Sequence, residues 1–308
     1  MYNILYKLYF IIQRKESCRK EYGKAPSRLN QWLIGHIEAY YNIWIKNKYT
    51  KRNSEHSGVT RVKREQGIIV SLTSYPKRIQ TLWMTIETLL RQTKKPDRVI
   101  LWLAEDQFKG IESLPQELLN QRKRGLEIRF CDDLKSHKKY YYVIRENPED
   151  LIVLVDDDMF YPYDMIEQLL KMHQKYPKDI CATTAQVITE SFSNLPSKWR
   201  NPRVSEVWEH SDQIQVFTGS GSLFPPHVLP EEAFDKNKIQ LLCPYADDLW
   251  LTFMAYLNNK KITALYKWRA FPVMIYGTAK DGLYYINAEA GQNDKQWENL
   301  LNYYHKES

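Results

Sequence analysis

Three consecutive carboxylates follow directly on a strongly apolar segment of the chain. Leu151-Ile-Val-Leu-Val155 has the composition of a buried strand, and Asp156, Asp157 and Asp158 come immediately after it. Side chains two residues apart at an extended strand end share a side, so we expect Asp156 and Asp158 to converge while Asp157 points elsewhere. Because like charges within a few ångströms repel, such a pair requires a cation. The pattern predicts Mg²⁺ or Mn²⁺ bridging the phosphates of a nucleotide, with a solvent-exposed acidic turn as the alternative.

A second acidic pair, Asp247 and Asp248, opens an apolar segment with helical spacing. Carboxylates in the first turn of a helix are favoured by the helix dipole, so a capping pair is one interpretation. The other is that one of the two, exposed at a helix N-terminus, acts as a general base toward an acceptor hydroxyl. The residue types leave open which of the two would be the base.

Between the two acidic sites lies the loop Gly219-Ser220-Gly221. Its glycines allow close backbone approach or a positive φ angle, so the loop either lines a ligand or forms an ordinary turn. Lys138 and Lys139 open the helical segment that precedes the acidic strand. An ammonium there could meet a diphosphate as a point charge, and a solvated basic turn explains the pair about equally well.

Hydroxyl groups, an aromatic ring and a guanidinium follow the first apolar segment of the chain's main part. Thr73, Ser74, Tyr75 and Arg78 come directly after Ile68-Ile-Val-Ser-Leu72. We expect them at the ligand edge of a sheet, and a helix cap from Thr73 or Ser74 is compatible with that role.

The elements that must position these residues alternate regularly from Gly67 onward. Short apolar runs are separated by segments with helical periodicity, which indicates βαβ units in a mainly parallel sheet covered on both faces. Ligands of such sheets bind beyond the carboxyl ends of the strands, where the residues above are expected. The predicted strands are Ile68–Leu72, Val99–Leu103, Leu126–Cys131 and Leu151–Val155, and the predicted helices are Ile79–Leu90, Leu114–Arg122 and Lys138–Glu146.

The N-terminal fifth differs from the rest in charge and pattern. The chain's formal charge of +7 divides into +9 for residues 1–66 and −2 for residues 67–308. Apolar residues at helical spacing, with Ser27 placed to cap them, predict one amphipathic helix, and residues 46–66 resemble a linker. The periodic residues are Leu29, Trp32, Leu33, Ile37, Tyr40, Tyr41 and Trp44.

Composition and cysteine spacing indicate whether the chain folds and in which cellular compartment it resides. A chain that is 43% hydrophobic can bury a sizeable core, and its four cysteines lack paired spacing, which favours a reducing compartment. The apolar start, Tyr2 to Ile12, is too short to cross a membrane and lacks a cleavage site, so we expect a cytoplasmic protein. We expect residues 1–45 to meet anionic lipid at the inner face of the cell membrane through Tyr2–Ile12 and the Trp32/Trp44 face; docking on the catalytic domain or a second subunit is the alternative.

Taken in order, these motifs resemble the GT-A fold nucleotide-sugar glycosyltransferases, especially the family-2-like enzymes of bacterial surface polysaccharide synthesis. The resemblance covers about two-thirds of the chain, from Gly67 to Tyr266. The matching segments are Thr73-Ser-Tyr-Pro-Lys-Arg78, Leu89-Leu-Arg-Gln-Thr-Lys-Lys-Pro-Asp97, Lys138-Lys139, Asp156-Asp-Asp158, Gly219-Ser-Gly221 and Ala246-Asp-Asp-Leu-Trp250.

The resemblance implies a GT-A-like, Rossmann-related domain over residues 67–308, with residues 67–160 as nucleotide-sugar half and 161–308 as acceptor half. It implies metal-dependent, inverting transfer of a sugar from a nucleoside diphosphate, with a UDP-sugar favoured, to a glycan or lipid-linked acceptor. Asp156 and Asp158 match the metal motif, and Asp247 and Asp248 match the region of the base. The donor is expected to contact Thr73, Ser74, Tyr75, Arg78, Asp132, Asp133, Lys138, Lys139, Asp156, Asp157, Gly219, Ser220 and Gly221.

Two departures from the family pattern concern the base and the metal. Ala246 stands where the family usually has a Glu before the Asp, and His305 is the sole late histidine, so the third metal ligand is unassigned. An acceptor site is expected among the aromatic and basic residues of the tail. These are Trp268, Arg269, Tyr276, Lys280, Tyr284 and Tyr285.

Two other functions compete with sugar transfer. Sugar-phosphate nucleotidyl transfer also uses metal-binding carboxylates on an α/β sheet, but no Gly-rich, basic triphosphate loop follows the first strand. Nucleic-acid binding would fit the overall positive charge, but residues 67–308 are slightly acidic and no nucleic-acid-binding signature is present. We therefore expect no nucleic-acid partner.

Overall fold

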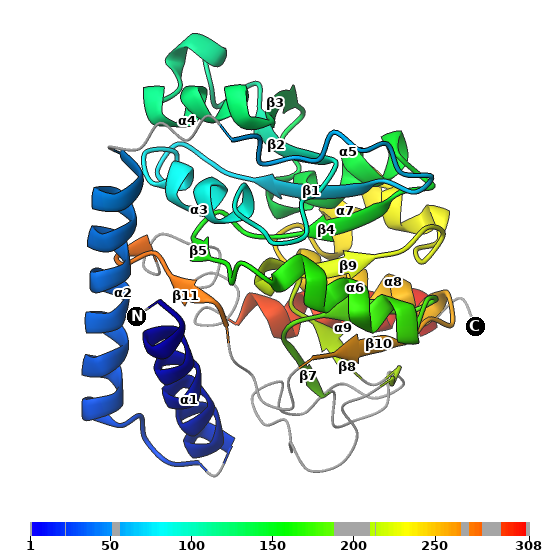
Figure 1. The fold of residues 1–308 in the computed structure, drawn as a ribbon. Helices are drawn as coiled ribbons and strands as arrows, with labels where there is room; N and C mark the ends of the chain where they lie inside the picture. Colours follow the sequence, from blue (N-terminus) through cyan, green and yellow to red (C-terminus); the bar gives the residue numbers. More distant parts are fainter. Residues whose placement is uncertain are drawn as a thin grey trace.

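The chain folds around one seven-stranded sheet with the order β10-β6-β9-β4-β1-β2-β3 (Figure 1). The structure is a computed structural model that describes residues 2–21, 23–50, 56–187, 210–212, 214–265, 271–278 and 291–305. The strands of the sheet are β1 (Ile68–Thr73), β2 (Arg98–Ala104), β3 (Leu126–Cys131), β4 (Leu151–Leu154), β6 (Ile180–Ala182), β9 (Ser222–Phe224) and β10 (Ile262–Ala264).

The sheet is mostly parallel, as the alternation of strands and helices predicts. β1 pairs in parallel with β2 and β4, β2 with β3, and β10 with β6, whereas β9 runs antiparallel to both of its neighbours. Two small antiparallel pairs lie outside it: β5 (Met159–Phe160) with β11 (Val273–Met274), and β7 (Ala185–Val187) with β8 (Ile214–Val216). The predicted α/β class with a mainly parallel sheet is confirmed.

Helices cover both faces of the sheet. The predicted helix at 138–146 is confirmed residue for residue, whereas the one predicted at 79–90 begins only at Leu82, because residues 76–81 form turns. The helices of this part of the chain are α3 (Leu82–Leu89), α4 (Gln116–Asn120), α5 (Lys138–Glu146), α6 (Met165–Lys175), α7 (Lys236–Leu242), α8 (Asp247–Leu257) and α9 (Gln292–His305). Short 3₁₀ turns are η1 (Ile111–Ser113), η2 (Gln121–Arg124), η3 (Lys135–His137), η4 (Thr218–Ser220) and η5 (Glu231–Phe234).

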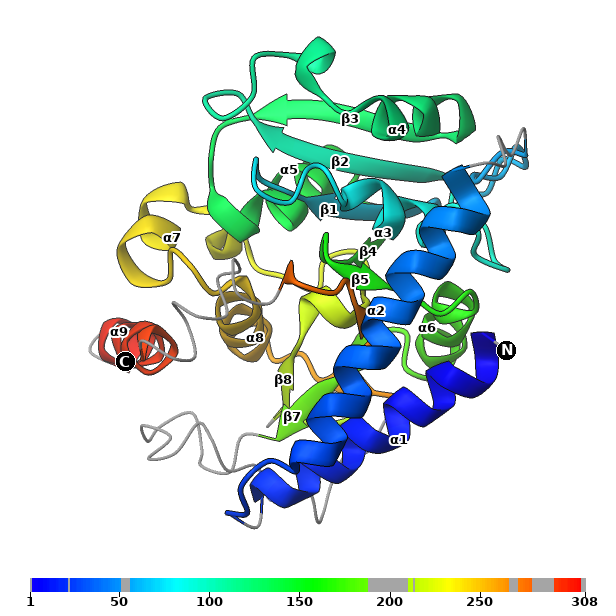
Figure 2. The ribbon, with the colours of Figure 1, turned by 90° about the vertical axis from the view of Figure 1, so that its left-hand side faces the viewer.

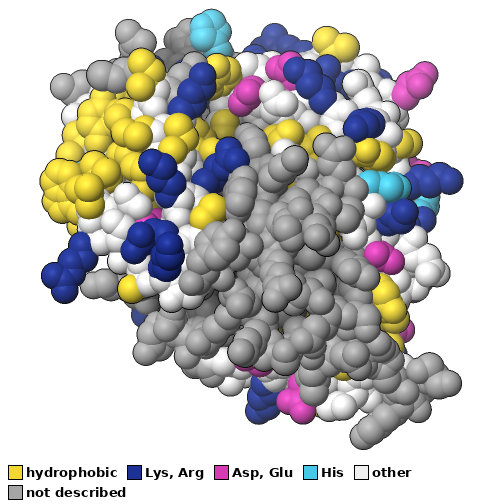
Figure 3. Space-filling model, turned by 90° about the horizontal axis from the view of Figure 1, so that it is seen from below, with side chains coloured by type: hydrophobic (Ala, Val, Ile, Leu, Met, Phe, Trp, Pro, Cys, Tyr) yellow, Lys and Arg dark blue, Asp and Glu magenta, His cyan; other side chains and the backbone are white. Residues whose placement is uncertain are grey.

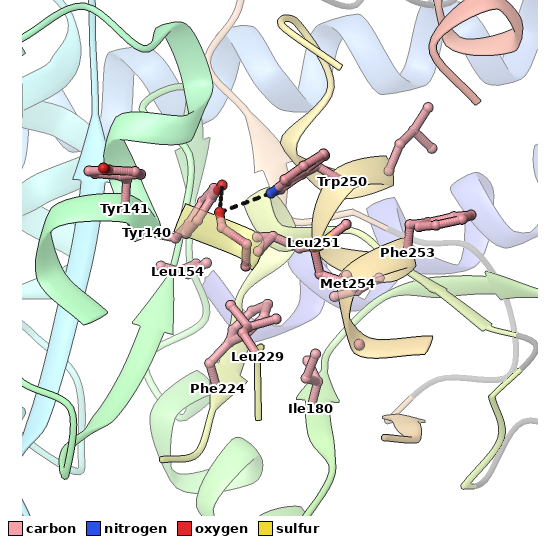
Figure 4. Packing of buried hydrophobic residues seen from close by; sticks show 14 of the residues in the cluster. Tyr140, Tyr141, Leu154, Ile180, Phe224, Leu229, Trp250, Leu251, Phe253 and Met254 are labelled. Atoms are coloured by element: carbon pink, nitrogen blue, oxygen red, sulfur yellow. Dashed lines mark hydrogen bonds between the residues drawn. The ribbon is translucent and has the colours of Figure 1, made fainter. Parts of the chain in front are cut away.

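Alternate residues of each central strand enter two different cores. Val70 and Leu101 pack with α3 and α6 on one face, and Ile69 and Ile100 pack with α5, α8 and α9 on the other. In the second core, the Trp250 indole and the Tyr140 hydroxyl both donate to the carbonyl of Ala233, at 3.1 and 2.9 Å (Figure 4). These bonds satisfy the polar atoms of two buried rings.

The N-terminal residues form a helical hairpin of α1 (Tyr2–Glu21) and α2 (Arg28–Thr50) that packs on the domain built around the sheet, the sheet domain (Figures 1 and 2). The hairpin buries its inner face against α3, β5 and β11, so docking on the rest of the chain, one of the alternatives for this arm, is realised. The buried cluster consists of Tyr9, Ile12, Ile37, Tyr41, Ile45, Met84, Phe160, Val273 and Ile275.

The linker predicted at 46–66 is wrong in its first part, because α2 continues to Thr50. Within 56–66 the chain bonds to the sheet domain: Gly58 donates to the carbonyl of Arg124 at 2.8 Å, and Arg64 pairs with Asp97 at 2.6 Å. Among the described helices, none is both long enough and apolar enough to cross a membrane.

Candidate active site

The acidic segment lies at the carboxyl end of β4, beside the end of β1. Asp157 accepts a hydrogen bond from the Ser74 hydroxyl at 2.5 Å, and Arg78 Nη1 pairs with Asp157 at 2.6 Å and with Asp158 at 3.0 Å. The expectation that Asp157 points away from Asp158 is therefore wrong. The chain bends at residues 157–158 instead of staying extended, which removes the alternation of a strand.

Asp156 turns to a different cation. Its carboxylate is 38% exposed, and Lys139 Nζ lies 2.7 Å from its Oδ1 and 2.9 Å from Oδ2 of Asp247. The Lys139 side chain is only 3% exposed, so one buried ammonium joins the end of β4 to the start of α8. Burial disfavours its charge, yet Asp156 and Asp247 raise the pKa of Lys139 far above its ordinary value.

Asp247 and Asp248 share a second partner, Thr218. The Thr218 hydroxyl contacts both carboxylates, lying 2.8 Å from Asp247 Oδ2, and its backbone N–H donates to Asp248 Oδ1 at 2.9 Å. Ala246 is the N-cap of α8, and no side chain caps the helix there. The pair is therefore held by Lys139 and Thr218, which the simple capping interpretation does not explain.

The pKa values of the two carboxylates are shifted in opposite directions. Burial opposes the ionisation of Asp247, but the Lys139 ammonium lowers its pKa below the ordinary value. Burial and the neighbouring Asp247 raise the pKa of Asp248 to about 7. Asp247 is 5% exposed, whereas Asp248 is half-buried and reaches solvent. Asp247 is thus the enclosed carboxylate whose charge Lys139 stabilises, and Asp248 is the partly exposed one whose ionisation burial opposes.

The loop between the two acidic sites requires glycine at positions 219 and 221. A Cβ on Gly219 would lie 1.7 Å from Oδ2 of Asp156, and one on Gly221, whose φ is +106°, would lie 2.5 Å from Sδ of Met165. The Gly219 carbonyl accepts from the Asp156 N–H at 3.3 Å. The close approach allowed by this loop therefore seats the Asp156 carboxylate.

The remaining predicted donor residues make mostly internal contacts. Thr73 donates to the carbonyl of Trp102 at 2.8 Å, and Ser220 donates to that of Phe217 at 2.8 Å. The Tyr75 ring lies 5.6 Å from the Arg78 guanidinium.

A separate group of charges surrounds the end of β3. Lys138 pairs with Asp133 at 2.5 Å, and Asp132 pairs with Lys236 at 2.5 Å while its side chain stays 72% exposed. Lys138 is 2% exposed and Lys139 3%, so the alternative of a solvated basic turn is wrong. Both ammonium groups hold carboxylates of the chain itself.

Sequence reasoning missed two residues that hold the candidate site residues in place, Thr218 and Tyr161. Thr218 stands directly before the glycine loop, so the loop was a usable signal for it. The buried Tyr161 hydroxyl lies 2.7 Å from the Asp156 N–H and 2.5 Å from the Gly219 carbonyl, which ties the acidic segment to the loop. Nothing in the local sequence of Tyr161 distinguishes it from a core aromatic residue.

The carboxylates suit a hard divalent cation. Within the described residues, no group of three or more His, Cys, Asp or Glu forms a complete protein cage. Mg²⁺ is commonly held by one or two carboxylates plus substrate phosphates, which matches Asp156 and Asp158. Burial raises the pKa of Asp158 to about 7, with Asp157 and Asp156 adding to this shift and Arg78 opposing it. Carboxylate oxygens such as theirs are the ligand type that Mg²⁺ and Mn²⁺ prefer.

Most of the predicted acceptor tail lies outside the described residues, namely Trp268, Arg269, Lys280, Tyr284 and Tyr285. Tyr276 is described and is 58% exposed, and its backbone N–H donates to Asn42 of α2 at 3.2 Å. His305 is the last residue of α9.

Comparisons with known proteins give distant structural neighbours, of which we name two. No family model and no curated protein matches the sequence. The chain is similar to PcManGT, a mannosyltransferase from Pyrobaculum calidifontis in complex with GDP-Man and Mn²⁺, at 12% identity and a TM-score of 0.40, over 83% of this chain and 66% of that one. It is also similar to residues 1–349 of TarS from S. aureus, at 14% identity and a TM-score of 0.40, over 65% of this chain and 58% of that one. The chain spans less than two-thirds of the length of either neighbour, so its activity is inferred from the geometry of its own site.

Proposed function

We propose that this chain is a metal-dependent, inverting glycosyltransferase that moves a sugar from a nucleoside diphosphate to an acceptor hydroxyl. The observation that carries the proposal is the meeting of two acidic sites on one buried lysine: Lys139 Nζ lies 2.7 Å from Asp156 and 2.9 Å from Asp247. The Asp156–Asp158 segment has the ligands for a metal-bound diphosphate, and the Asp247–Asp248 pair has a base for the acceptor.

Asp248 is the better candidate for the base. Asp247 is enclosed and paired with Lys139, whereas Asp248 is half-buried and held in place by the Thr218 N–H at 2.9 Å. With a pKa of about 7, the Asp248 carboxylate can take a proton near neutral pH. In the proposed step, the acceptor oxygen bonds to the anomeric carbon as the bond to the diphosphate breaks. The acceptor proton passes to Asp248, and the single displacement inverts the anomeric centre.

On the donor side, residues of the chain itself hold the carboxylates of the acidic segment in place. Asp156 and Asp158 would hold Mg²⁺ or Mn²⁺, which when bound supplies positive charge to the leaving diphosphate. Arg78 orients Asp157 and Asp158, and Ser74 donates to Asp157. Lys139 holds Asp156 beside Asp247 and Asp248. The metal-binding carboxylate and the base therefore keep a fixed position relative to each other.

The remaining particulars are also proposals. We propose a UDP-sugar as donor and a glycan or lipid-linked acceptor in surface polysaccharide synthesis, on the motif resemblance described above. We propose a cytoplasmic location with peripheral contact to the cell membrane, on the lack of paired cysteine spacing and the basic N-terminal hairpin. The division into residues 1–66, 67–160 and 161–308 belongs to the same proposal.

The deciding experiment is turnover of a panel of nucleotide sugars with Mn²⁺, with Mg²⁺ and with EDTA. We expect a nucleoside diphosphate as product, loss of turnover in EDTA, and loss in Asp158→Ala. Asp248→Asn should lower kcat by about 10²- to 10⁴-fold, because it removes the proton acceptor. Asp294→Asn, an exposed carboxylate in the first turn of α9, is the matched control and should leave kcat unchanged. Full activity of Asp248→Asn would refute the base assignment, and pyrophosphate release from a nucleoside triphosphate would indicate nucleotidyl transfer instead.

A further inference from the structure

The helical hairpin carries an apolar stripe on the side that does not face the catalytic domain. Within each helix the exposed apolar residues are spaced three, four or eight positions apart, so they share one face. The members of this apolar stripe are Ile4, Leu8 and Ile11 on α1, and Leu29, Trp32, Tyr40 and Ile43 on α2. Figure 3 shows apolar side chains gathered on the side of the molecule where Figure 1 places the hairpin.

The apolar stripe is separate from the face of the hairpin that packs on the rest of the chain. The same helices bury Tyr9, Tyr41 and Ile45 against the catalytic domain, with exposed fractions of 1% or less. Ile4 is 71% and Ile43 61% exposed. Trp44, which the sequence placed on the membrane face, packs instead at the edge of the buried cluster, its ring 6.3 Å from that of Tyr41. The hairpin therefore has two apolar faces, one used within the described chain and one open.

The charges around the stripe have one sign. Exposed cations accompany it along both helices and the turn, and Figure 3 shows Lys and Arg side chains beside the apolar patch. Of the acidic side chains described on the hairpin, Glu16 accepts from the Ser27 N–H at 3.0 Å and Glu38 accepts from the Tyr9 hydroxyl at 2.8 Å, so both are engaged within it. The exposed cations are Lys7, Lys15, Lys24, Arg28, Lys46 and Lys48.

We propose that the apolar stripe binds the surface of a membrane rich in anionic lipid. An apolar helix face flanked by cations, with aromatic residues among it, is complementary to the boundary between acyl chains and anionic headgroups. Trp32 and Tyr40 supply rings that favour this interfacial depth. The hairpin lies along the surface, since neither helix is apolar enough to span it.

The hairpin is also joined to the active site. Asn42 of α2 exchanges hydrogen bonds with the backbone of Tyr276, at 3.2 and 3.4 Å. Two residues later, the Thr278 carbonyl accepts from Arg78 Nη2 at 3.2 Å, and the same guanidinium pairs with Asp157 and Asp158. A membrane bound to the stripe is therefore connected to the acidic segment through one short stretch of chain.

Flotation of the full chain with vesicles tests the surface without requiring any catalytic turnover. We expect binding to vesicles of phosphatidylcholine with phosphatidylserine, and much weaker binding to phosphatidylcholine alone. The triple variant Ile4→Ser, Trp32→Ser, Ile43→Ser should bind at least about tenfold less. The double variant Lys7→Gln, Lys46→Gln should lose about fivefold per cation removed.

The controls are matched by exposure and lie away from the hairpin. Val62→Ser with Leu241→Ser removes apolar residues that are 71% and 69% exposed, and Lys109→Gln with Lys123→Gln removes exposed cations. Both controls should float like the wild-type chain. No flotation of the wild-type chain, or equal flotation of hairpin and control variants, would overturn the proposal. A self-associated chain that the hairpin variants convert to monomer, without vesicle binding, would assign the stripe to a second copy instead.

Discussion

At the scale of single residues, Gly219 is the position where one added methyl group should do most harm. A Cβ added there would lie 1.7 Å from Oδ2 of Asp156, the carboxylate that Lys139 holds. Gly219→Ala should therefore displace Asp156 and lower kcat by about 10²-fold or more, because a misplacement near 1 Å has effects of that order. Steady-state kinetics would measure it.

The matched control for that substitution is Gly35→Ala. Gly35 lies within α2, and its Cβ would meet only Cε2 of Tyr276, at 3.9 Å. We expect unchanged kcat and a gain in stability of about 0.4–1 kcal/mol, since alanine restricts the unfolded chain. Equal kcat for the wild-type chain and Gly219→Ala would contradict the role given to the glycine.

Lys139 should matter for stability as well as for the site. Lys139→Met leaves Asp247 buried without its cation, and removing one partner of a buried ion pair typically costs about 3–5 kcal/mol. Urea unfolding would measure this loss. Lys171→Met removes an exposed lysine paired with Glu167 at 2.8 Å and should leave the free energy of unfolding nearly unchanged. Similar losses in the two variants would show that Lys139 does not act as a buried counter-ion.

The residue types of the site could be predicted, but their partners could not. Asp156–Asp158, Gly219 and Asp247 stand out because each follows a local pattern of strand, loop or helix. The Lys139 ammonium contacts both Asp156 and Asp247 because the fold brings together three segments that are far apart along the chain. The lysine was expected to face a diphosphate, because no local pattern records which carboxylates the fold brings to it.

At the scale of elements, the contact between α1 and α2 should depend on pH. Glu38 is half-buried and accepts from the Tyr9 hydroxyl at 2.8 Å, and burial raises its pKa from 4.5 to about 7. A pKa raised by folding means that the proton is bound more tightly in the folded chain. The stability that it contributes is complete below about pH 4.5 and is lost as the pH rises through about 7.

Unfolding free energies of the wild-type chain and Glu38→Gln, measured across this range, test the assignment. After allowance for partial exposure, we expect the wild-type chain to lose about 1–3 kcal/mol more than the variant between pH 5 and 8. The glutamine remains neutral, so the difference isolates Glu38 from the other titrating groups. Parallel curves for the two proteins would remove Glu38 as the source.

Periodicity predicted the elements more reliably than it predicted their packing partners. β3 and α5 have the bounds that the apolar pattern indicated. The pattern of α2 showed an amphipathic helix, but Tyr41 and Tyr40, adjacent in sequence, face the catalytic domain and solvent respectively. A helix with apolar residues on two faces gives no sequence signal for which face docks inward.

At the scale of the whole molecule, the hairpin and the domain built around the sheet should unfold together. The Tyr41 ring, 1% exposed, stacks on Phe160 of β5 at 5.9 Å, and the surrounding cluster joins α1 and α2 to α3 and β11. Tyr41→Ala should leave a cavity at this junction and cost about 3–5 kcal/mol, as aromatic-to-alanine changes in cores do. Because the cluster includes residues from both parts, the loss should shift one cooperative calorimetric transition. Tyr40→Ala, at a ring that is 37% exposed, should shift that transition much less.

A separate early transition that appears only in Tyr41→Ala would instead show that the hairpin folds and detaches on its own. Residues 1–66, with their formal charge of +9, would then be a module added to a sheet domain that folds without them.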